Sequence, residues 1–252
     1  MGPPVDVDRV LADLYAAAEA VAFALAEHAD WGPSGNRPGQ YASDVVADEA
    51  VRSVLLPLGY GLISEESEVV ESAEGRPVLV VDPLDGSTNA SRGIPHFAVS
   101  LCAVDDEGPL AAVVLNLAIG TCYEAVRGGG ARRDGATLWR DDLPPLSEAI
   151  VGVSGLPPLN PGWAQFRCLG AAALDLCAVA DGTLDGYVDC VTDAHGVWDY
   201  LGALLICREA GVTVLDARGR DLCVLDRSTR RTPVAGVGPA ITDGLMKACR
   251  GS

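Results

Sequence analysis

The 252-residue sequence predicts a mixed α/β (α+β) fold in which helices cover β-sheets. Apolar residues recur at helical spacing in two early segments, residues 6–28 and 43–57. Between residues 97 and 127, short apolar runs separated by turn residues predict an antiparallel meander. Hydrophobic residues make up 49% of the chain and charged residues 21%, a balance typical of a globular protein with a sizeable core.

The first half of the chain is expected to combine two helices with the beginning of a sheet. The opening helix spans residues 6–28, and the second helix is expected to stop near Pro57. Strands are expected at 61–63 and 78–81. Pro83 is expected to end the second of these ladders, because proline has no N–H to donate.

The meander and the elements after it define the rest of the expected fold. The glycines at 128–130 are expected to end the meander, whose strands we place at 97–104, 110–116 and 122–127. A polar, proline-bearing stretch then indicates a boundary near residue 140, between subdomains 1–140 and 141–252. Strands and helices alternate after this boundary. Strands are expected at 149–152, 186–190 and 212–215, and helices at 171–180 and 200–210. Gly211 is expected to cap the second of these helices.

Composition excludes several classes of protein. The net charge of −17 argues against a nucleic acid polymer or an anionic membrane as the main partner. The eight cysteines form no Cys-x-x-Cys pair, which argues against a zinc site, and no EF-hand spacing supports a calcium-binding structural protein. The sequence carries neither a signal-peptide pattern nor an apolar stretch of transmembrane length, so the expected location is the cytoplasm.

The most informative segment is Val-Leu-Val-Val-Asp-Pro-Leu-Asp-Gly-Ser-Thr-Asn, residues 78–89. It delivers two carboxylates, Asp82 and Asp85, to the end of a buried strand, where they can bind a hard divalent cation such as Mg²⁺. Gly86 and Ser87 follow at the start of a possible helix, whose free N–H groups can hold a phosphate. The segment therefore predicts metal-assisted phosphate chemistry.

Two further acidic elements accompany this segment. Glu65 and Glu66 end the strand-like run Gly-Leu-Ile-Ser-Glu-Glu, and an acidic pair of this kind on its own is usually a solvated loop. Asp199, in Val-Trp-Asp-Tyr, stands at the start of an apolar helix, where an aspartate is usually a favourable cap.

Taken together, the three elements resemble the motifs of the inositol monophosphatase family. Asp-Pro-Leu-Asp-Gly-Ser-Thr-Asn matches the family's central motif, and Trp198-Asp199 with its helix matches the second motif. Ser64-Glu65-Glu66 resembles the Gly-Glu-Glu element, with serine in place of glycine. The resemblance extends from the opening helix to the strand after Gly211. It implies a layered αβαβα sandwich of the inositol monophosphatase and sugar phosphatase type, usually a homodimer, that hydrolyses a small phosphorylated alcohol such as a cyclitol or sugar phosphate.

The resemblance also implies roles for individual residues in the metal site. Two or three Mg²⁺ ions would be held by Glu65, Asp82, Asp85 and Asp199 together with the carbonyl of Leu84. Ser87 and Glu65 would orient the attacking water, and the N–H groups of Gly86 and Ser87 would hold phosphate oxygens.

Asp44 is expected either to contact a third, weakly held ion or to be only a helix N-cap. Tyr41 stands where the family has threonine, and Arg37 is the nearest cation to the family's missing lysine.

The substrate pocket is expected in the second subdomain, which also supplies Asp199. The resemblance places the backbone of Gly170 and Ala171 along the pocket, and Asp189 near the family's acidic residue that binds substrate hydroxyls. His195 lies in a short insertion beside the pocket and is a candidate substrate contact. Histidinol phosphate and a 3′-phosphonucleotide remain alternative substrates, although no basic patch is evident near the pocket. A catalytically silent acidic binding protein is the alternative from another class.

Overall fold

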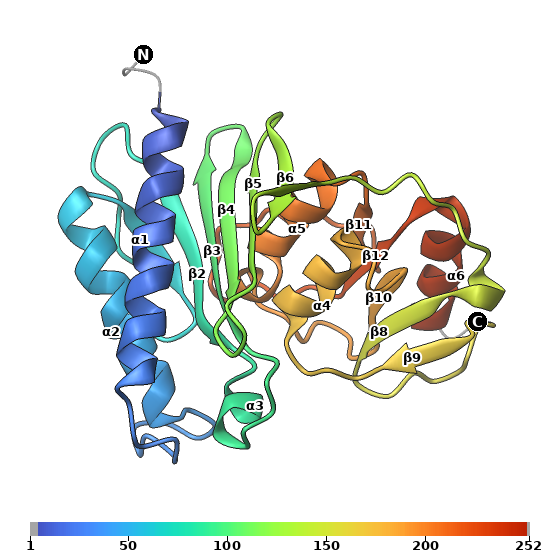
Figure 1. The fold of residues 1–252 in the computed structure, drawn as a ribbon, viewed down its shortest axis with the longest axis horizontal. Helices are drawn as coiled ribbons and strands as arrows, with labels where there is room; N and C mark the ends of the chain where they lie inside the picture. The colour runs from blue at the N-terminus through green and yellow to red at the C-terminus, as the bar shows by residue number, and fades with distance from the viewer. Residues whose placement is uncertain (1–4, 251–252) are drawn as a thin grey trace.

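The computed structural model describes residues 5–250, and these residues form five alternating layers of helix and sheet (Figure 1). Helices α1 (Val7–Ala26) and α2 (Ala42–Leu55) cover one face of a seven-stranded sheet. Helices α4 (Ala172–Ala180) and α5 (Leu201–Glu209) lie between this sheet and a second, five-stranded sheet. Helix α6 (Gly238–Arg250) covers the outer face of the second sheet. The expected αβαβα layering is confirmed.

The first sheet follows chain order from β1 to β7. Only β1 and β2 are parallel, and every later pair is antiparallel, as the predicted meander requires. The expected end of the series at 128–130 is wrong, because two further strands follow. They are joined at Asp134 and Gly135, which both have positive φ as two-residue hairpin turns demand. The strands are β1 (Gly61–Ser64), β2 (Val78–Asp85), β3 (Ala98–Asp105), β4 (Gly108–Asn116), β5 (Cys122–Val126), β6 (Gly130–Arg133) and β7 (Ala136–Leu138).

Strand β2 does not end at Pro83 as expected. Its register against β3 shifts between Asp82, opposite Ser100, and Asp85, opposite Ala98. One extra residue on β2 therefore forms a bulge, and Pro83 lies within it, where a strand tolerates proline. The bulge lets a single strand present Asp82 and Asp85 at its carboxyl end.

The second sheet has the order β11-β12-β10-β8-β9. Strand β10 is parallel to β8 and antiparallel to β12. Strand β12 and helix α6 have no counterpart among the predicted elements. The strands are β8 (Ile150–Ser154), β9 (Gln165–Arg167), β10 (Gly186–Asp189), β11 (Thr213–Asp216) and β12 (Pro233–Gly236), and the short helical turns are α3 (Ser87–Ser91), η1 (Leu56–Leu58), η2 (Leu146–Glu148) and η3 (Val197–Asp199).

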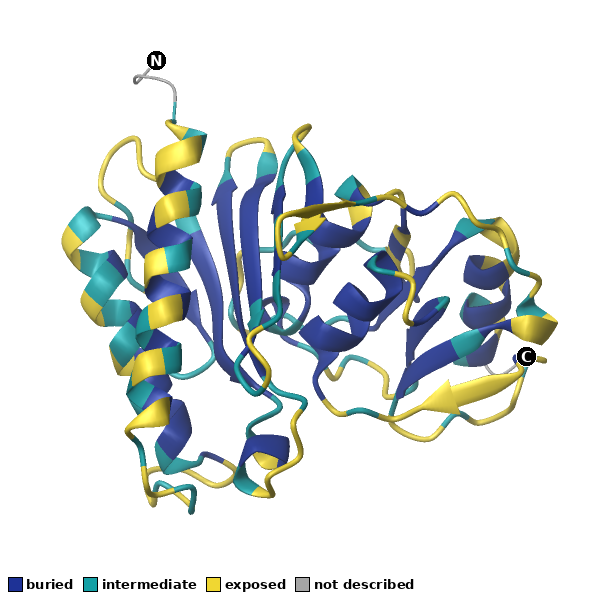
Figure 2. Ribbon diagram, in the orientation of Figure 1, coloured by how far each residue is buried: buried dark blue, intermediate teal, exposed yellow. Residues whose placement is uncertain are grey.

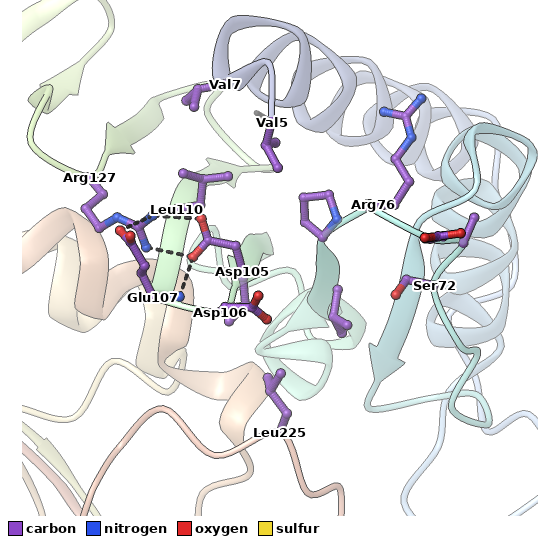
Figure 3. A pocket seen from close by; sticks show the side chains of 16 residues that line it. Val5, Val7, Ser72, Arg76, Asp105, Asp106, Glu107, Leu110, Arg127 and Leu225 are labelled. Carbon is purple, nitrogen blue, oxygen red and sulfur yellow. Dashed lines mark hydrogen bonds and ion pairs between the residues drawn. The ribbon is translucent and has the colours of Figure 1, made fainter. Parts of the chain in front are cut away.

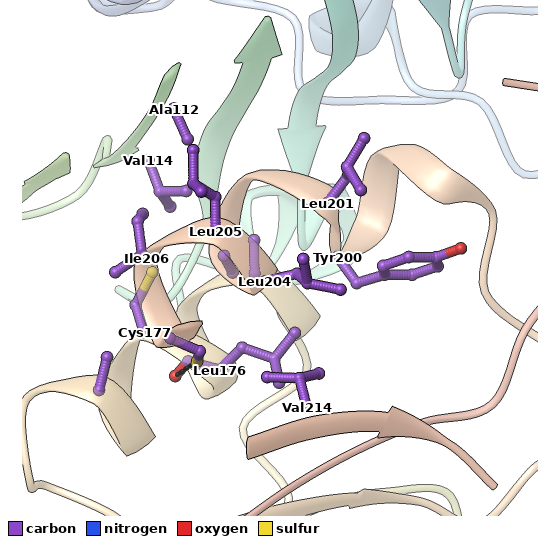
Figure 4. Packing of buried hydrophobic residues seen from close by; sticks show 14 of the residues in the cluster. Ala112, Val114, Leu176, Cys177, Tyr200, Leu201, Leu204, Leu205, Ile206 and Val214 are labelled. Atoms are coloured by element: carbon purple, nitrogen blue, oxygen red, sulfur yellow. Dashed lines mark hydrogen bonds between the residues drawn. The ribbon is translucent and has the colours of Figure 1, made fainter. Parts of the chain in front are cut away.

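Every residue of α4 is buried, and so are residues 201–207 of α5, which explains why both helices are rich in apolar residues (Figure 2). Leu201 and Leu205 lie on the α5 side of this core with Val114 of β4, and Leu176 of α4 lies in the same cluster (Figure 4). Helix α5 ends as predicted, because Gly211 adopts a φ of 84° and the next N–H bonds back to the Cys207 carbonyl at 2.8 Å. This packing holds the first turns of α4 and α5 in fixed positions.

The cysteines form no disulfide within the described residues, and most are at least partly buried, as expected of small apolar side chains. Within the described residues, no helix is both long enough and apolar enough to cross a bilayer.

Candidate active site

Three carboxylates from separate parts of the chain meet at the carboxyl end of β2. Glu65 follows β1, Asp82 belongs to β2, and Asp199 ends the η3 turn directly before α5. One carboxylate oxygen of each lies within 4.8 Å of the others. The parallel pairing of β1 and β2 brings Glu65 and Asp82 to the same edge of the sheet. The structure therefore joins three of the predicted acidic residues in one cluster.

The electrostatics of this cluster indicate a deficit of positive charge. Burial, and then the negative charge of Asp199, raise the pKa of Glu65 to about 8. The same two causes raise the pKa of Asp85 to about 8. Burial and the charge of Glu65 raise the pKa of Asp82 well above its usual range. A divalent cation with oxygen ligands would relieve this repulsion, and the cluster offers only oxygen ligands.

Asp85 connects the cluster to the helix layer. Its two carboxylate oxygens accept the N–H groups of Ala172 (3.2 Å) and Ala173 (2.8 Å), in the first turn of α4, where a negative charge is favoured. Leu84 lies between the two aspartates, and its N–H donates to Asp82 Oδ1 at 3.1 Å. The motif is thus anchored to both halves of the molecule.

Gly86 is required by the local backbone. Its φ is +82°, and a Cβ there would lie 3.0 Å from the His96 carbonyl oxygen and 3.1 Å from the Ala171 Cβ. Asn89, which sequence reasoning missed, fixes the same region by donating to the carbonyls of His96 and Leu169, each at 2.8 Å. The predicted pocket residues Gly170 and Ala171 are therefore held directly against the central motif.

Asp44 is the third residue of α2 and not its N-cap, which is Tyr41, while its contact with a metal ion stays a prediction. Its Oδ2 accepts the N–H of Tyr41 at 2.8 Å, which is the helix-capping arrangement. Its buried Oδ1 has no hydrogen-bond partner within the described residues, and burial raises the Asp44 pKa to about 6. Asp44 shares a cavity with Glu65 and Ser87, so the unsatisfied oxygen remains available to a cation.

His195 is built into the site and does not lie on an exposed loop. Its Nδ1 is 3.2 Å from Asp199 Oδ2, and its Nε2 is 3.2 Å from the Tyr187 hydroxyl and 3.6 Å from Asp189 Oδ2. Burial alone would lower its pKa, but the hydrogen bond and charge of Asp199, with Asp189 and Asp85, raise the pKa to about 9. His195 therefore links the predicted metal ligand Asp199 to β10.

A cavity of about 230 Å³ adjoins the cluster on the side of His195. Asp189, the expected contact of substrate hydroxyls, is fully buried and is not among its lining residues. It lines instead a separate cavity of about 200 Å³, and its Oδ2 is 3.6 Å from His195 Nε2. Asp175 lines the first cavity together with Asp85 and Asp199, and its Oδ1 is 2.9 Å from His96 Nε2. Sequence reasoning missed Asp175, although an acidic residue inside the otherwise apolar helix α4 was a visible signal.

A third cavity, of about 410 Å³, borders the cluster at Glu65 and Ser87. Arg37, Arg227 and Arg230 contribute to its lining. The expectation that no basic patch lies near the site is therefore wrong. Two of these arginines come from residues 217–232, between β11 and β12, a segment that the sequence analysis left unassigned.

A larger cavity, of about 840 Å³, lies elsewhere (Figure 3). It adjoins Val78, at the opposite end of β2 from Asp85. Its principal charges are already neutralised, because Arg127 pairs with Asp105 at 2.7 Å and with Glu107 at 3.3 Å. The acidic cluster, and not this larger hollow, therefore carries the chemistry expected from the sequence.

Comparison with known proteins agrees with this geometry. The model of the inositol monophosphatase family matches residues 10–249. An inositol-1-monophosphatase of Rhizobium meliloti (strain 1021) is 37% identical over 202 residues, covering 72% of this chain and 74% of the relative. A fructose-1,6-bisphosphatase/inositol-1-monophosphatase of Thermococcus kodakarensis is 36% identical over 196 residues, covering 77% and 76%. The structure of the extragenic suppressor protein suhB from Bartonella henselae superposes with a TM-score of 0.80 at 26% identity, covering 96% of this chain and 98% of that one.

Proposed function

Because the chain belongs to the inositol monophosphatase family and is a phosphomonoesterase, we propose that it hydrolyses a small phosphate monoester in a Mg²⁺-dependent reaction. The observation that carries this proposal is the convergence of Glu65, Asp82 and Asp199 within 4.8 Å. Burial and the neighbouring negative charges raise the pKa of Glu65 and of Asp82, and a bound cation would neutralise this repulsion. A catalytically silent binding protein would have no use for this strained arrangement.

The residues present fit a magnesium site. Glu65, Asp82, Asp85 and Asp199, with the carbonyl of Leu84, would hold two or three ions, and the unsatisfied Oδ1 of Asp44 is available to the last of them. Magnesium bound there would neutralise the phosphate, lower the pKa of a water and stabilise the leaving oxygen.

The chain's own groups would position the reactants. The Ser87 hydroxyl and Glu65 border the same cavity, and we assign them to orient the attacking water. The N–H groups of Gly86 and Ser87, at the start of α3, would hold phosphate oxygens. Attack from this side would drive the alcohol away into the cavity of about 230 Å³ on the side of Asp199 and His195.

That cavity favours a polyol as the alcohol. It presents the Asp85, Asp175 and Asp199 carboxylates, the Tyr187 hydroxyl and His195, which together can accept from and donate to several hydroxyl groups. Gly170 and Ala171 contribute backbone to its wall. We therefore favour a cyclitol or sugar phosphate as the substrate and keep histidinol phosphate as the alternative.

The assembly and location follow as further parts of the proposal. The family resemblance supports a homodimer, which light scattering would test. The absence of disulfides among the described cysteines fits a reducing cytoplasm.

The test is phosphate release from inositol, sugar, histidinol and nucleotide monophosphates, with Mg²⁺ and with EDTA. We expect hydrolysis only with Mg²⁺, and Asp85→Asn should reduce it by orders of magnitude because a charge is lost at the cation site. Glu148→Gln removes the same charge at an exposed position and serves as the matched control. Full activity of Asp85→Asn, or undiminished release in EDTA, would refute the proposal.

A further inference from the structure

Two arginines lie against the ring of Trp198 beside the acidic cluster. The guanidinium carbon of Arg227 is 5.9 Å from the ring centre and that of Arg230 is 4.9 Å from it. Both side chains are half-buried, Trp198 is 5% exposed, and all three line the cavity of about 410 Å³ that also contains Glu65 and Ser87. Two cations are therefore fixed at the wall of a cavity that opens onto the site.

Neither arginine has a carboxylate partner. Within the described residues, no ion pair is formed by Arg227 or by Arg230, whereas Arg37 in the same cavity pairs with Glu66. Arg227 donates to the carbonyls of Ser64 (3.0 Å) and Glu65 (2.7 Å).

Within the described residues, Arg230 uses fewer of its donor nitrogens in hydrogen bonds than Arg227 does. Only its Nη1 is used, by the carbonyls of Arg227 (2.9 Å) and Thr229 (3.0 Å). A guanidinium carries five N–H donors, so the Nε and Nη2 donors of Arg230 remain for a ligand.

This arrangement is costly without an anion. Two positive charges against one indole repel each other, and partial burial weakens their hydration. The chain carries 35 acidic residues against 18 basic ones, so it has many carboxylates that could have paired with Arg227 and Arg230. An oxyanion between the two guanidiniums would remove the repulsion and occupy the free donors, because planar guanidinium groups match phosphate geometry.

We propose that this cavity binds a phosphate-class oxyanion at Arg227 and Arg230, separate from the phosphate held at the acidic cluster. Which molecule supplies this anion depends on the phosphatase function proposed above. It is either product orthophosphate, which attack from the Glu65 and Ser87 side would leave facing this cavity, or a second phosphate group on the substrate.

Binding is tested by calorimetric titration of inorganic phosphate into the full chain at low ionic strength in EDTA. Arg230→Gln should weaken binding about tenfold, the loss expected for charge-assisted hydrogen bonds, and Arg230→Lys should weaken it less because the charge remains. Arg132→Gln removes an exposed arginine that pairs with Glu124 on the first sheet, and this control should bind as the unaltered chain does. Equal affinity of the unaltered chain and Arg230→Gln, or no phosphate binding by either, would overturn the proposal.

Two kinetic arms with Mg²⁺ distinguish the sources. If the anion is product, Arg230→Gln should raise the inhibition constant of orthophosphate about tenfold while the preference between monophosphates and bisphosphates stays unchanged. If the anion is a second phosphate, Arg230→Gln should lower kcat/KM for sugar bisphosphates relative to monophosphates. Neither change, in an active enzyme, would overturn the inference and leave the phosphatase assignment intact. Absence of all phosphatase activity would refute the proposed function, and the calorimetric result would still decide whether the cavity binds phosphate.

Discussion

Replacing Glu65 with glutamine should stabilise the metal-free protein while removing a ligand of the proposed cation. The Glu65 carboxylate lies within 4.8 Å of oxygens of Asp82 and Asp199. Burial, followed by the negative charges of Asp199 and Glu66, raises its pKa to about 8. Gln has nearly the same volume but no charge, so the substitution removes the repulsion and keeps the packing. In EDTA the protein should therefore become more stable, although an active-site residue has been lost.

Proton linkage gives the direction and the size of this change in the free energy of unfolding. The pKa of Glu65 rises from 4.5 in its ordinary environment to about 8 in the folded chain. Between these pH values the folded state keeps a proton that the unfolded state has released, so the free energy of unfolding falls as pH rises and the loss is complete above about pH 8. The full pKa change corresponds to at most about 5 kcal/mol. Since Asp82 and Asp199 share the same repulsion, we expect a gain of about 2 kcal/mol from Glu65→Gln, or about 4–8 °C in Tm.

The assay is thermal unfolding of the unaltered chain, Glu65→Gln and the surface control Glu148→Gln, at pH 5 and pH 8, in EDTA and in Mg²⁺. Glu65→Gln should melt higher in EDTA at pH 8, differ little at pH 5, and gain less than the unaltered chain from Mg²⁺. Identical melting in EDTA at pH 8, or an equal gain from Mg²⁺, would refute the electrostatic reasoning.

Three further substitutions test separate parts of the site. Ser87→Ala should lower kcat more than KM, and Ser87→Thr should retain activity because the hydroxyl is kept; equal rates for the two variants would remove Ser87 from the reaction. His195→Ala should change relative kcat/KM among phosphorylated alcohols more than it changes hydrolysis of p-nitrophenyl phosphate, and an unchanged rank order would argue against a role in specificity. Asn89→Ala removes two hydrogen bonds of 2.8 Å and should lower the free energy of unfolding by about 1–3 kcal/mol, which an unchanged urea midpoint would contradict.

The sequence predicted those helices and strands whose hydrophobic pattern and turn residues lie within one short segment. The opening helix begins within a residue of its expected start because Asp6 caps it, and the meander follows from apolar runs bounded by turns. Three strands and one helix were missed. For β6 and β7 the signal was present, since Asp134-Gly135 is a strong hairpin pair, but the preceding glycines were interpreted as the end of the sheet.

The residues of the candidate site likewise divide into those that the sequence predicted and those that it did not. The family resemblance grouped Glu65, Asp82 and Asp199, and in the structure two parallel strands and one helix start bring these residues together. The partners of these residues come from distant segments that no local pattern connects. Arg227 meets the Glu65 carbonyl, and Asp175 meets His96, only through the packing of the layers. Asp189 was expected to contact the substrate directly. In the structure His195 lies between Asp189 and the pocket, which the sequence does not show.

Phosphate release in ¹⁸O-labelled water, with and without Mg²⁺, tests the central claim most directly. If water oriented by Glu65 and Ser87 attacks phosphorus, each phosphate released should carry one ¹⁸O, the alcohol should carry none, and both products should depend on Mg²⁺. Label in the alcohol would show that the carbon–oxygen bond breaks. That result, or labelled phosphate released at the same rate in EDTA, would contradict the assignment of the acidic cluster to a cation that activates water.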